Sequence, residues 1–174
     1  SMKSVGEAMA VGRSFEESLQ KALRSIEIGL TGLNSVTPPF ADATSGLDQL
    51  RGWLCELVPN RVLRIASALR HGLSIDEVHA VTGWDRWFLE RIQAIIDAEN
   101  KVVAYGLPDD ATVLRFLKSM GFSDARLAEL AQIDAKDVRS SRSKAGVLPV
   151  YKRIDTCAAE FSSETAYLYS TYEI

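Results

Sequence analysis

The chain has 174 residues, a length that allows one domain to bury a sizeable core without a disulfide or a metal ion. Its formal net charge of −3 argues against a general nucleic-acid-binding surface, and its 47% hydrophobic and 25% charged residues are ordinary for a globular protein. No run of 18 apolar residues occurs, so no membrane-spanning helix is expected. The two cysteines, Cys55 and Cys157, are far apart and are interpreted as free, buried thiols in a reducing cytoplasm.

The most informative pattern is an internal repeat. Residues 72–89 correspond to residues 121–138, 49 positions later. Gly72 aligns with Gly121, and a serine follows two residues after each glycine. In both copies the glycine ends one helix and the serine caps the next. A repeat of this period usually marks a duplicated helical unit, so the sequence predicts an all-α fold, a compact multi-helix domain of two related helical halves.

The first helix is predicted to begin at a capping box formed by Ser14 and Glu17. Apolar residues then recur at helical spacing on one face: Phe15, Leu19, Leu23, Ile26 and Leu30. The opposite face is expected to point to solvent, with Glu16, Gln20 and Arg24. Gly29 or Gly32 is expected to end this helix.

Further helices are predicted after the loop that contains Pro38 and Pro39. They begin near Ser45, Asn60, Ser74, Asp85, Asp109 or Asp110, Ser123 and Asp134. The longest follows Asp85, runs to about Ala104 and is expected to be the central core helix, with Trp87, Phe88 and Val103 among its buried residues. The three tryptophans are interpreted as core anchors.

The two ends of the chain differ in character from this helical body. Residues 3–12 are short, punctuated by glycine and mostly apolar, and residues 147–172 are rich in β-branched and aromatic residues without a helical period. Both are predicted to be extended arms. Because such short pieces do not form a stable sheet alone, they are expected to belong to neighbouring domains of a longer protein.

The sequence shows no pattern typical of a catalytic or metal site. His71 and His79 have no cysteine or carboxylate set at ligand spacing, and no phosphate-binding glycine loop occurs. Adjacent acids such as Asp109 and Asp110 stand in first helical turns, where they complement the helix dipole.

A helix-turn-helix DNA-binding or adaptor module is the alternative interpretation, because each repeat unit consists of a helix, a tight turn and a helix. The last helix of the second unit carries four basic residues: Lys136, Arg139, Arg142 and Lys144. Acidic residues of the same unit, including Asp134 and Asp137, would repel the DNA backbone, so nucleic-acid binding is not favoured.

The segments KSVGEAMAVGRSFEESLQKALRSIE and VYKRIDTCAAEFSSETAYLYSTYE resemble two segments of the large subunit of bacterial-type carbamoyl-phosphate synthase, and GLSIDEVHAVTGWDRWFLERI resembles its helical body. The resemblance implies a non-catalytic connection or oligomerisation domain, residues 14–146. Residues 1–13 would be the tail of the preceding ATP-grasp domain, and residues 147–174 a linker toward the second one.

The resemblance also implies a function for the parent enzyme. It would make carbamoyl phosphate from bicarbonate, glutamine-derived ammonia and two ATP in the cytoplasm, for arginine and pyrimidine biosynthesis. ATP and Mg or Mn would bind in domains outside this chain, so the chain alone is expected to be inactive. Glu7 would lie beside the internal tunnel of the parent. The implied partners are the flanking ATP-grasp domains, a glutaminase small subunit and, in a homo-oligomer, a second copy of the chain.

Overall fold

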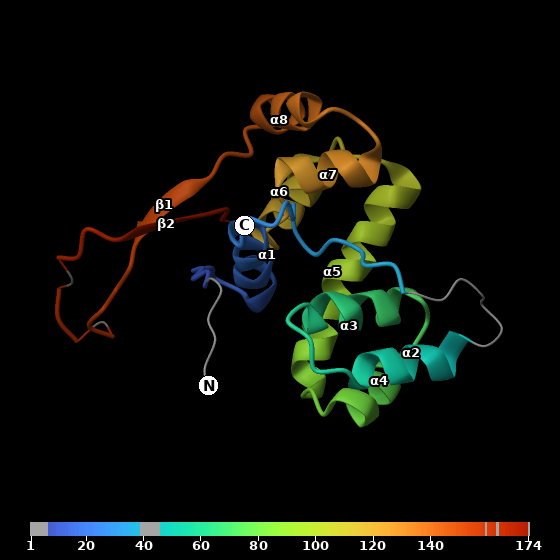
Figure 1. Cartoon of the computed structure of the whole chain (residues 1–174). Coiled ribbons are helices and arrows are strands. Elements are labelled where there is room, and N and C mark those ends of the chain that lie inside the picture. The colour runs from blue at the N-terminus through green and yellow to red at the C-terminus, as the bar shows by residue number, and fades with distance from the viewer. Residues whose placement is uncertain (1–6, 39–45, 159, 163, 174) are drawn as a thin grey trace. The chain divides into compact units, whose positions relative to one another are not determined.

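The structure is a computed structural model that describes residues 7–38, 46–158, 160–162 and 164–173. Within these residues the chain forms eight helices and two short strands (Figure 1). The helices are α1 (Phe15–Ser25), α2 (Gly46–Cys55), α3 (Arg61–Arg70), α4 (Ile75–Thr82), α5 (Arg86–Tyr105), α6 (Ala111–Ser119), α7 (Asp124–Ala131) and α8 (Ala135–Lys144). The predicted helical fold with short extended arms is confirmed, although residues 3–6 of the first arm and Ser45 lie outside the described residues.

The chain divides into two compact units. The first unit comprises the residues up to Gly32 and those from Lys101 onward, and therefore contains α1, α6, α7, α8 and the end of α5. The second unit, residues 33–100, contains α2, α3, α4 and most of α5. Each unit carries one copy of the sequence repeat.

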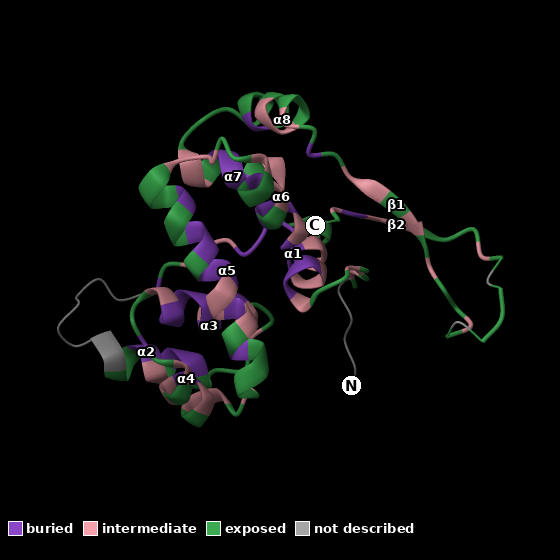
Figure 2. Cartoon of the chain, turned by 180° about the vertical axis from the view of Figure 1, so that it is seen from behind, coloured by how far each residue is buried: buried purple, intermediate pink, exposed green. Residues whose placement is uncertain are grey.

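The second unit has a core of aliphatic side chains to which α2, α3 and α4 contribute through mutual contacts. Among its most buried residues are Leu54, Ile65, Ala66, Val78, Leu89, Ile92 and Ile95. Buried residues are concentrated on α3 and along α5 (Figure 2). Arg70 forms an ion pair with the buried Glu99 and donates a hydrogen bond to the carbonyl of Leu33, which fixes the chain where it enters the unit.

The two copies of the repeat have the same local geometry. Gly72 and Gly121 adopt left-handed backbone conformations with φ of 95° and 90°. Ser74 and Ser123 then cap helices α4 and α7, each of eight residues, by accepting a hydrogen bond from the backbone N–H three residues later. The predicted glycine stop and serine cap are thus confirmed in both copies.

The C-terminal arm forms an antiparallel hairpin of β1 (Val150–Arg153) and β2 (Leu168–Thr171), with Val150 opposite Thr171. The hairpin belongs to the first unit and is held against α1 by polar contacts. The Thr171 hydroxyl donates to Glu17, and the Lys21 ammonium donates both to the carbonyl of Ser170 and to that of Val11 in the N-terminal arm. Both arms therefore meet at the same helix.

The solvent-facing side predicted for α1 is wrong at two positions. Glu16 is 8% exposed and Gln20 is completely buried. The Gln20 amide donates to the carbonyl of Met120 over 2.9 Å, so this face packs against the turn that joins α6 to α7. The helix also ends earlier than predicted, with Ile26 as its C-cap.

The aromatic residues at the start of α5 are not core residues, contrary to the prediction. Trp87 is 50% and Phe88 41% exposed, and their rings meet edge to face with centroids 5.0 Å apart. Val103, also predicted to be buried, is exposed. The tryptophan that does anchor the second unit is Trp53, whose ring is covered by the Arg64 guanidinium at 4.7 Å.

Candidate functional site

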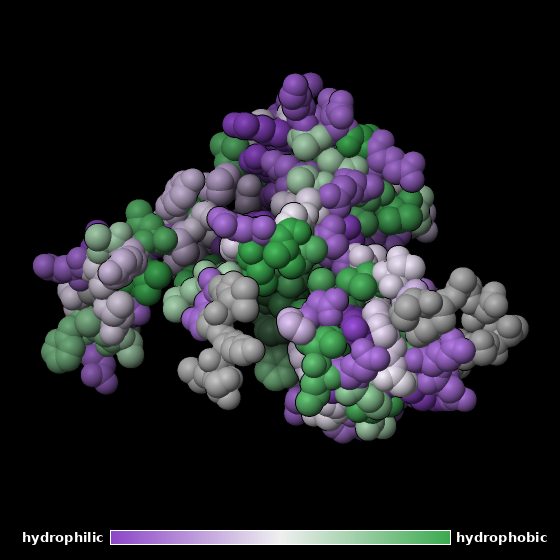
Figure 3. All heavy atoms as spheres, viewed as in Figure 1, coloured by the Kyte–Doolittle hydropathy of each residue, from purple (hydrophilic) through white to green (hydrophobic). Residues whose placement is uncertain are grey.

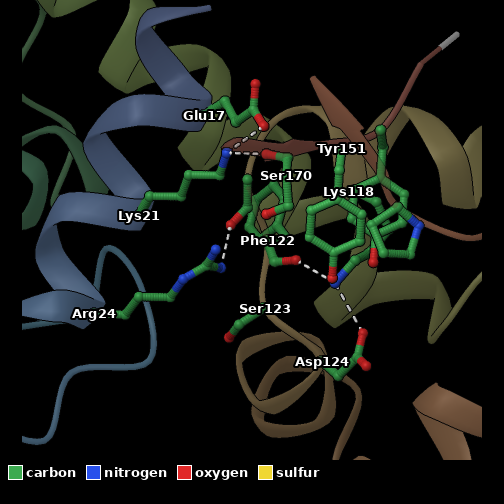
Figure 4. A pocket seen from close by; sticks show the side chains of 12 residues that line it. Glu17, Lys21, Arg24, Lys118, Phe122, Ser123, Asp124, Tyr151 and Ser170 are labelled. Atoms are coloured by element: carbon green, nitrogen blue, oxygen red, sulfur yellow. Dashed lines mark hydrogen bonds and ion pairs between the residues drawn. The ribbon is translucent and has the colours of Figure 1, made fainter. Parts of the chain in front are cut away.

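A cavity of about 250 Å³ lies in the first unit, at α1, the turn between α6 and α7, and the hairpin (Figure 4). Cationic, acidic and phenolic groups line it, among them Glu17, Lys21, Arg24, Lys118, Asp124 and Tyr172. Lys21 and Arg24 extend from α1 toward the side of the cavity that carries Lys118 and Asp124 (Figure 4). A concave site with converging polar groups is where a ligand or partner group would bind, so this cavity is the candidate functional site.

The α1 side of the cavity is set by helical spacing, because Glu17, Lys21 and Arg24 follow each other at intervals of four and three residues. The Glu17 side chain is buried and accepts hydrogen bonds from the backbone N–H of Arg13 over 2.7 Å and from Thr171. It also forms an ion pair with Lys21 at 2.8 Å. Glu17 and Lys21 therefore neutralise each other's charge, and their hydrogen bonds join α1 to both arms.

The opposite side is built around the last turn of α6 and the first turn of α7. The Lys118 ammonium donates to the carbonyl of Phe122 and to Asp124 over 2.8 Å, and lies 5.2 Å from the centroid of the Tyr172 ring. Burial lowers the pKa of Lys118, an effect that Asp124 partly offsets. Burial alone would raise the pKa of Asp124, but hydrogen bonds from Arg142 and Lys118 outweigh it and hold that pKa below its ordinary value.

Asp124→Asn is expected to destabilise the first unit by about 1–2 kcal/mol at neutral pH, because two cations lose their shared carboxylate at a partly exposed site. Since the folded-state pKa of Asp124 is lowered, its pairs add stability above the unfolded-state pKa. That stability disappears as the pH falls through the folded-state pKa. Urea denaturation of both proteins from pH 7 downward should therefore show the difference shrinking in acid.

A matched control is Asp109→Asn, which removes an exposed carboxylate of the same unit just before α6. It should change the stability little at any of these pH values. A loss in Asp124→Asn that stayed constant down to the most acidic condition would contradict the assigned ion pairs.

Comparison with known proteins identifies the family. The family described as the oligomerisation domain of the carbamoyl-phosphate synthetase large chain matches residues 7–146. The chain belongs to this family. It is 53% identical over 172 residues to the carbamoyl phosphate synthase large chain of Brucella melitensis and 54% identical over 173 residues to that of Rhizobium meliloti. Each match covers 99% of this chain but only 15% of the relative. The large chain of Pseudomonas aeruginosa is 49% identical over 176 residues, which cover 99% of this chain and 16% of the relative.

The residue singled out by resemblance is not part of the cavity lining. Glu7 is exposed in the N-terminal arm and is not among the residues that line the cavity. The two histidines make local contacts, His71 with the carbonyl of Ser67 and His79 with that of Trp84. Cys55 and Cys157 are free, as predicted, but they are not buried: Cys55 is exposed and Cys157 is partly exposed. None of the described helices is long and apolar enough to cross a membrane.

The helix-turn-helix alternative would use the basic residues of α8, a helix whose surface is largely hydrophilic (Figure 3). Arg142, however, is engaged with Asp124 at 3.0 Å and is therefore not available to a DNA phosphate. Lys136 and Arg139 are exposed, next to the acidic Asp134 and Asp137. The relatives described above are all named large chains of carbamoyl phosphate synthase, which gives no support to a DNA-binding module.

Sequence reasoning did not single out the residues that form the cavity, although part of the signal was present. Glu17, Lys21 and Arg24 share a helix face, and this spacing can be read directly from the sequence. Gly121 and Ser123 of the repeat also line the cavity. No local sequence pattern showed that the hairpin packs against this face of α1. The cavity between α1 and the region around Lys118 and Asp124 was therefore not predicted.

Proposed function

We propose that this chain is the connection and oligomerisation domain of a carbamoyl phosphate synthase large chain. The observation that carries this proposal is the family match over residues 7–146. The domain would hold two catalytic halves of the large chain in register and provide a helical surface for subunit association. The proposed boundaries are residues 1–13 for the end of the preceding ATP-grasp domain, 14–146 for the helical domain and 147–174 for the linker to the second ATP-grasp domain.

The position of the two arms supports a domain placed between two others. Lys21 donates to Val11 of the N-terminal arm and to Ser170 of the C-terminal arm, and Arg13 pairs with Glu173 at 2.8 Å. The two arms thus lie next to each other at α1, so the two proposed connections to the neighbouring domains are close together. By the same proposal, Glu7 borders the tunnel of the parent enzyme.

The whole enzyme is proposed to be an ATP-dependent carbon–nitrogen ligase that makes carbamoyl phosphate from bicarbonate, glutamine-derived ammonia and two ATP. Because this chain covers only 15–16% of the relatives' length, the groups that bind ATP and Mg or Mn are proposed to lie in the remaining domains. The isolated chain is accordingly expected to have no synthase activity. The proposal includes a glutaminase small subunit as a partner and a cytoplasmic location.

Sedimentation equilibrium of the purified chain over a wide range of concentrations tests the association role. We expect reversible self-association, because an isolated oligomerisation domain keeps its subunit contacts. Adding short duplex DNA at moderate salt should leave the mass distribution unchanged.

A chain that stayed monomeric at every concentration would contradict self-association through this domain. Salt-sensitive binding of the duplex would instead favour the helix-turn-helix alternative.

A further inference from the structure

The Arg24 side chain is only lightly engaged in the part of the chain that the structure describes. A guanidinium carries five N–H donors, and the hydrogen bond formed by Arg24 is the one to the carbonyl of Gly121 over 3.2 Å. Its neighbours desolvate it enough to lower its pKa below the ordinary value. The Arg24 guanidinium therefore lines the cavity without forming an ion pair to a carboxylate of the described residues.

The charges around the cavity do not balance. Glu17 is paired with Lys21 at 2.8 Å. Asp124 is shared by two cations, Lys118 at 2.8 Å and Arg142 at 3.0 Å. Among the residues that line the cavity there are three cations, Lys21, Arg24 and Lys118, and two carboxylates. Because Arg142 also pairs with Asp124, the cavity carries an excess of positive charge in a chain whose net charge is −3.

Further donors border the same space. Lys118 uses two of its three N–H groups on Phe122 and Asp124. The Tyr172 side chain also lines the cavity, and burial raises the pKa of its hydroxyl, so that this group is a neutral donor at physiological pH. Helix α7 begins at Asp124, which lines the cavity, so the N-terminal end of the helix dipole adds positive potential there.

We propose that this cavity binds a small oxyanion, a phosphate or a carboxylate group, with the Arg24 guanidinium as its main ligand and with Lys118 and Tyr172 as further donors. A planar fork of N–H groups matches the spacing of two oxygens on either anion, which makes Arg24 a bidentate ligand. The anion balances the surplus charge that the two carboxylates leave. The proposal concerns this cavity only and does not depend on the association role.

The test is a titration of the whole chain with inorganic phosphate, and separately with acetate, each at constant ionic strength maintained with chloride. Nuclear magnetic resonance should show saturable shifts of the Arg24 side-chain N–H signals and of the Gly121–Asp124 backbone amides. Arg24→Gln should weaken binding about tenfold or more, because a hydrogen bond to a charged group contributes at least that factor. Arg139→Gln is the matched control, since it removes an exposed charge of the same sign from α8 in the same unit.

Saturation by phosphate alone would assign the site to phosphate groups, and saturation by acetate would assign it to carboxylates, whether free or on an acidic side chain of an adjoining domain. The absence of saturable shifts with both anions would overturn the proposal. So would equal weakening by Arg24→Gln and Arg139→Gln, because that result would mean general charge screening. The amide spectrum of Arg24→Gln without added anion verifies that the variant is folded.

Discussion

Replacing Gly121 by alanine is expected to lower the free energy of unfolding of the first unit by roughly 3–5 kcal/mol. Two effects add up at this position. The backbone has a φ of 90°, a conformation that residues with a Cβ rarely adopt. A Cβ built on Gly121 would also lie 2.8 Å from the Glu17 Cα and 2.9 Å from the Glu17 carbonyl oxygen. Because these are backbone atoms of α1, the helix itself has to move away from the turn.

The repeat provides the control, since Gly72 occupies the equivalent position in the second unit. Its φ of 95° is nearly the same, but a Cβ there would have no neighbour within 4 Å. Gly72→Ala should therefore cost only the backbone strain, about 1 kcal/mol. Urea denaturation followed by circular dichroism measures both. Similar losses in the two variants would contradict a close approach of α1 to the turn at Gly121.

The agreement between sequence and structure is best where the signals are local. The glycine stops at Gly72 and Gly121 and the caps at Ser74 and Ser123 each depend on a few neighbouring residues, and all four are formed as predicted. Capping and left-handed turns arise from the chemistry of those residues alone. The duplicated helical unit could therefore be recognised without knowledge of the tertiary structure.

The predictions that proved wrong concern which face of a helix is buried. The burial of a helix face depends on segments that are distant in the sequence. Gln20 was expected in solvent because α1 has a conventional apolar face, yet the turn at Met120 packs on the other side and accepts its hydrogen bond. Trp87 and Phe88 were expected in the core, but no described segment covers them completely, and they are half exposed. Periodicity identifies faces but not the partners that bury them.

The candidate site shows the same limit. Its two sides come from α1 and from the region around Lys118 and Asp124, which are joined by tertiary contacts such as that between Gln20 and Met120. The resemblance to the carbamoyl phosphate synthase family was found from the sequence, but the residue that it suggested, Glu7, is not part of this cavity. Only the folded chain brings the unbalanced cations together.

Glu17→Gln is expected to destabilise the first unit by about 3–5 kcal/mol, because it breaks a buried ion pair by removing one partner. The Glu17 side chain is 2% exposed, and the groups around its carboxylate are donors: Lys21, the backbone N–H of Arg13 and the Thr171 hydroxyl. A glutamine fits the same space but turns its own NH₂ toward at least one of these donors. The Lys21 ammonium then stays largely buried without its counter-ion.

Glu17→Gln should also weaken the attachment of the two arms to α1. The loss of a helix cap alone would not have this effect. Thr171 is anchored by its hydroxyl to Glu17, so hydrogen exchange at the β2 amides should become faster in Glu17→Gln than in the parent chain. Glu77 is the matched control, because it occupies the same third helical position in α4, but its side chain is 37% exposed. Glu77→Gln should cause a much smaller loss and leave β2 exchange unchanged. If both variants lost equal stability and β2 exchange did not respond to Glu17→Gln, then Glu17 would act only as a capping residue, and the buried carboxylate would not be what joins the two arms to α1.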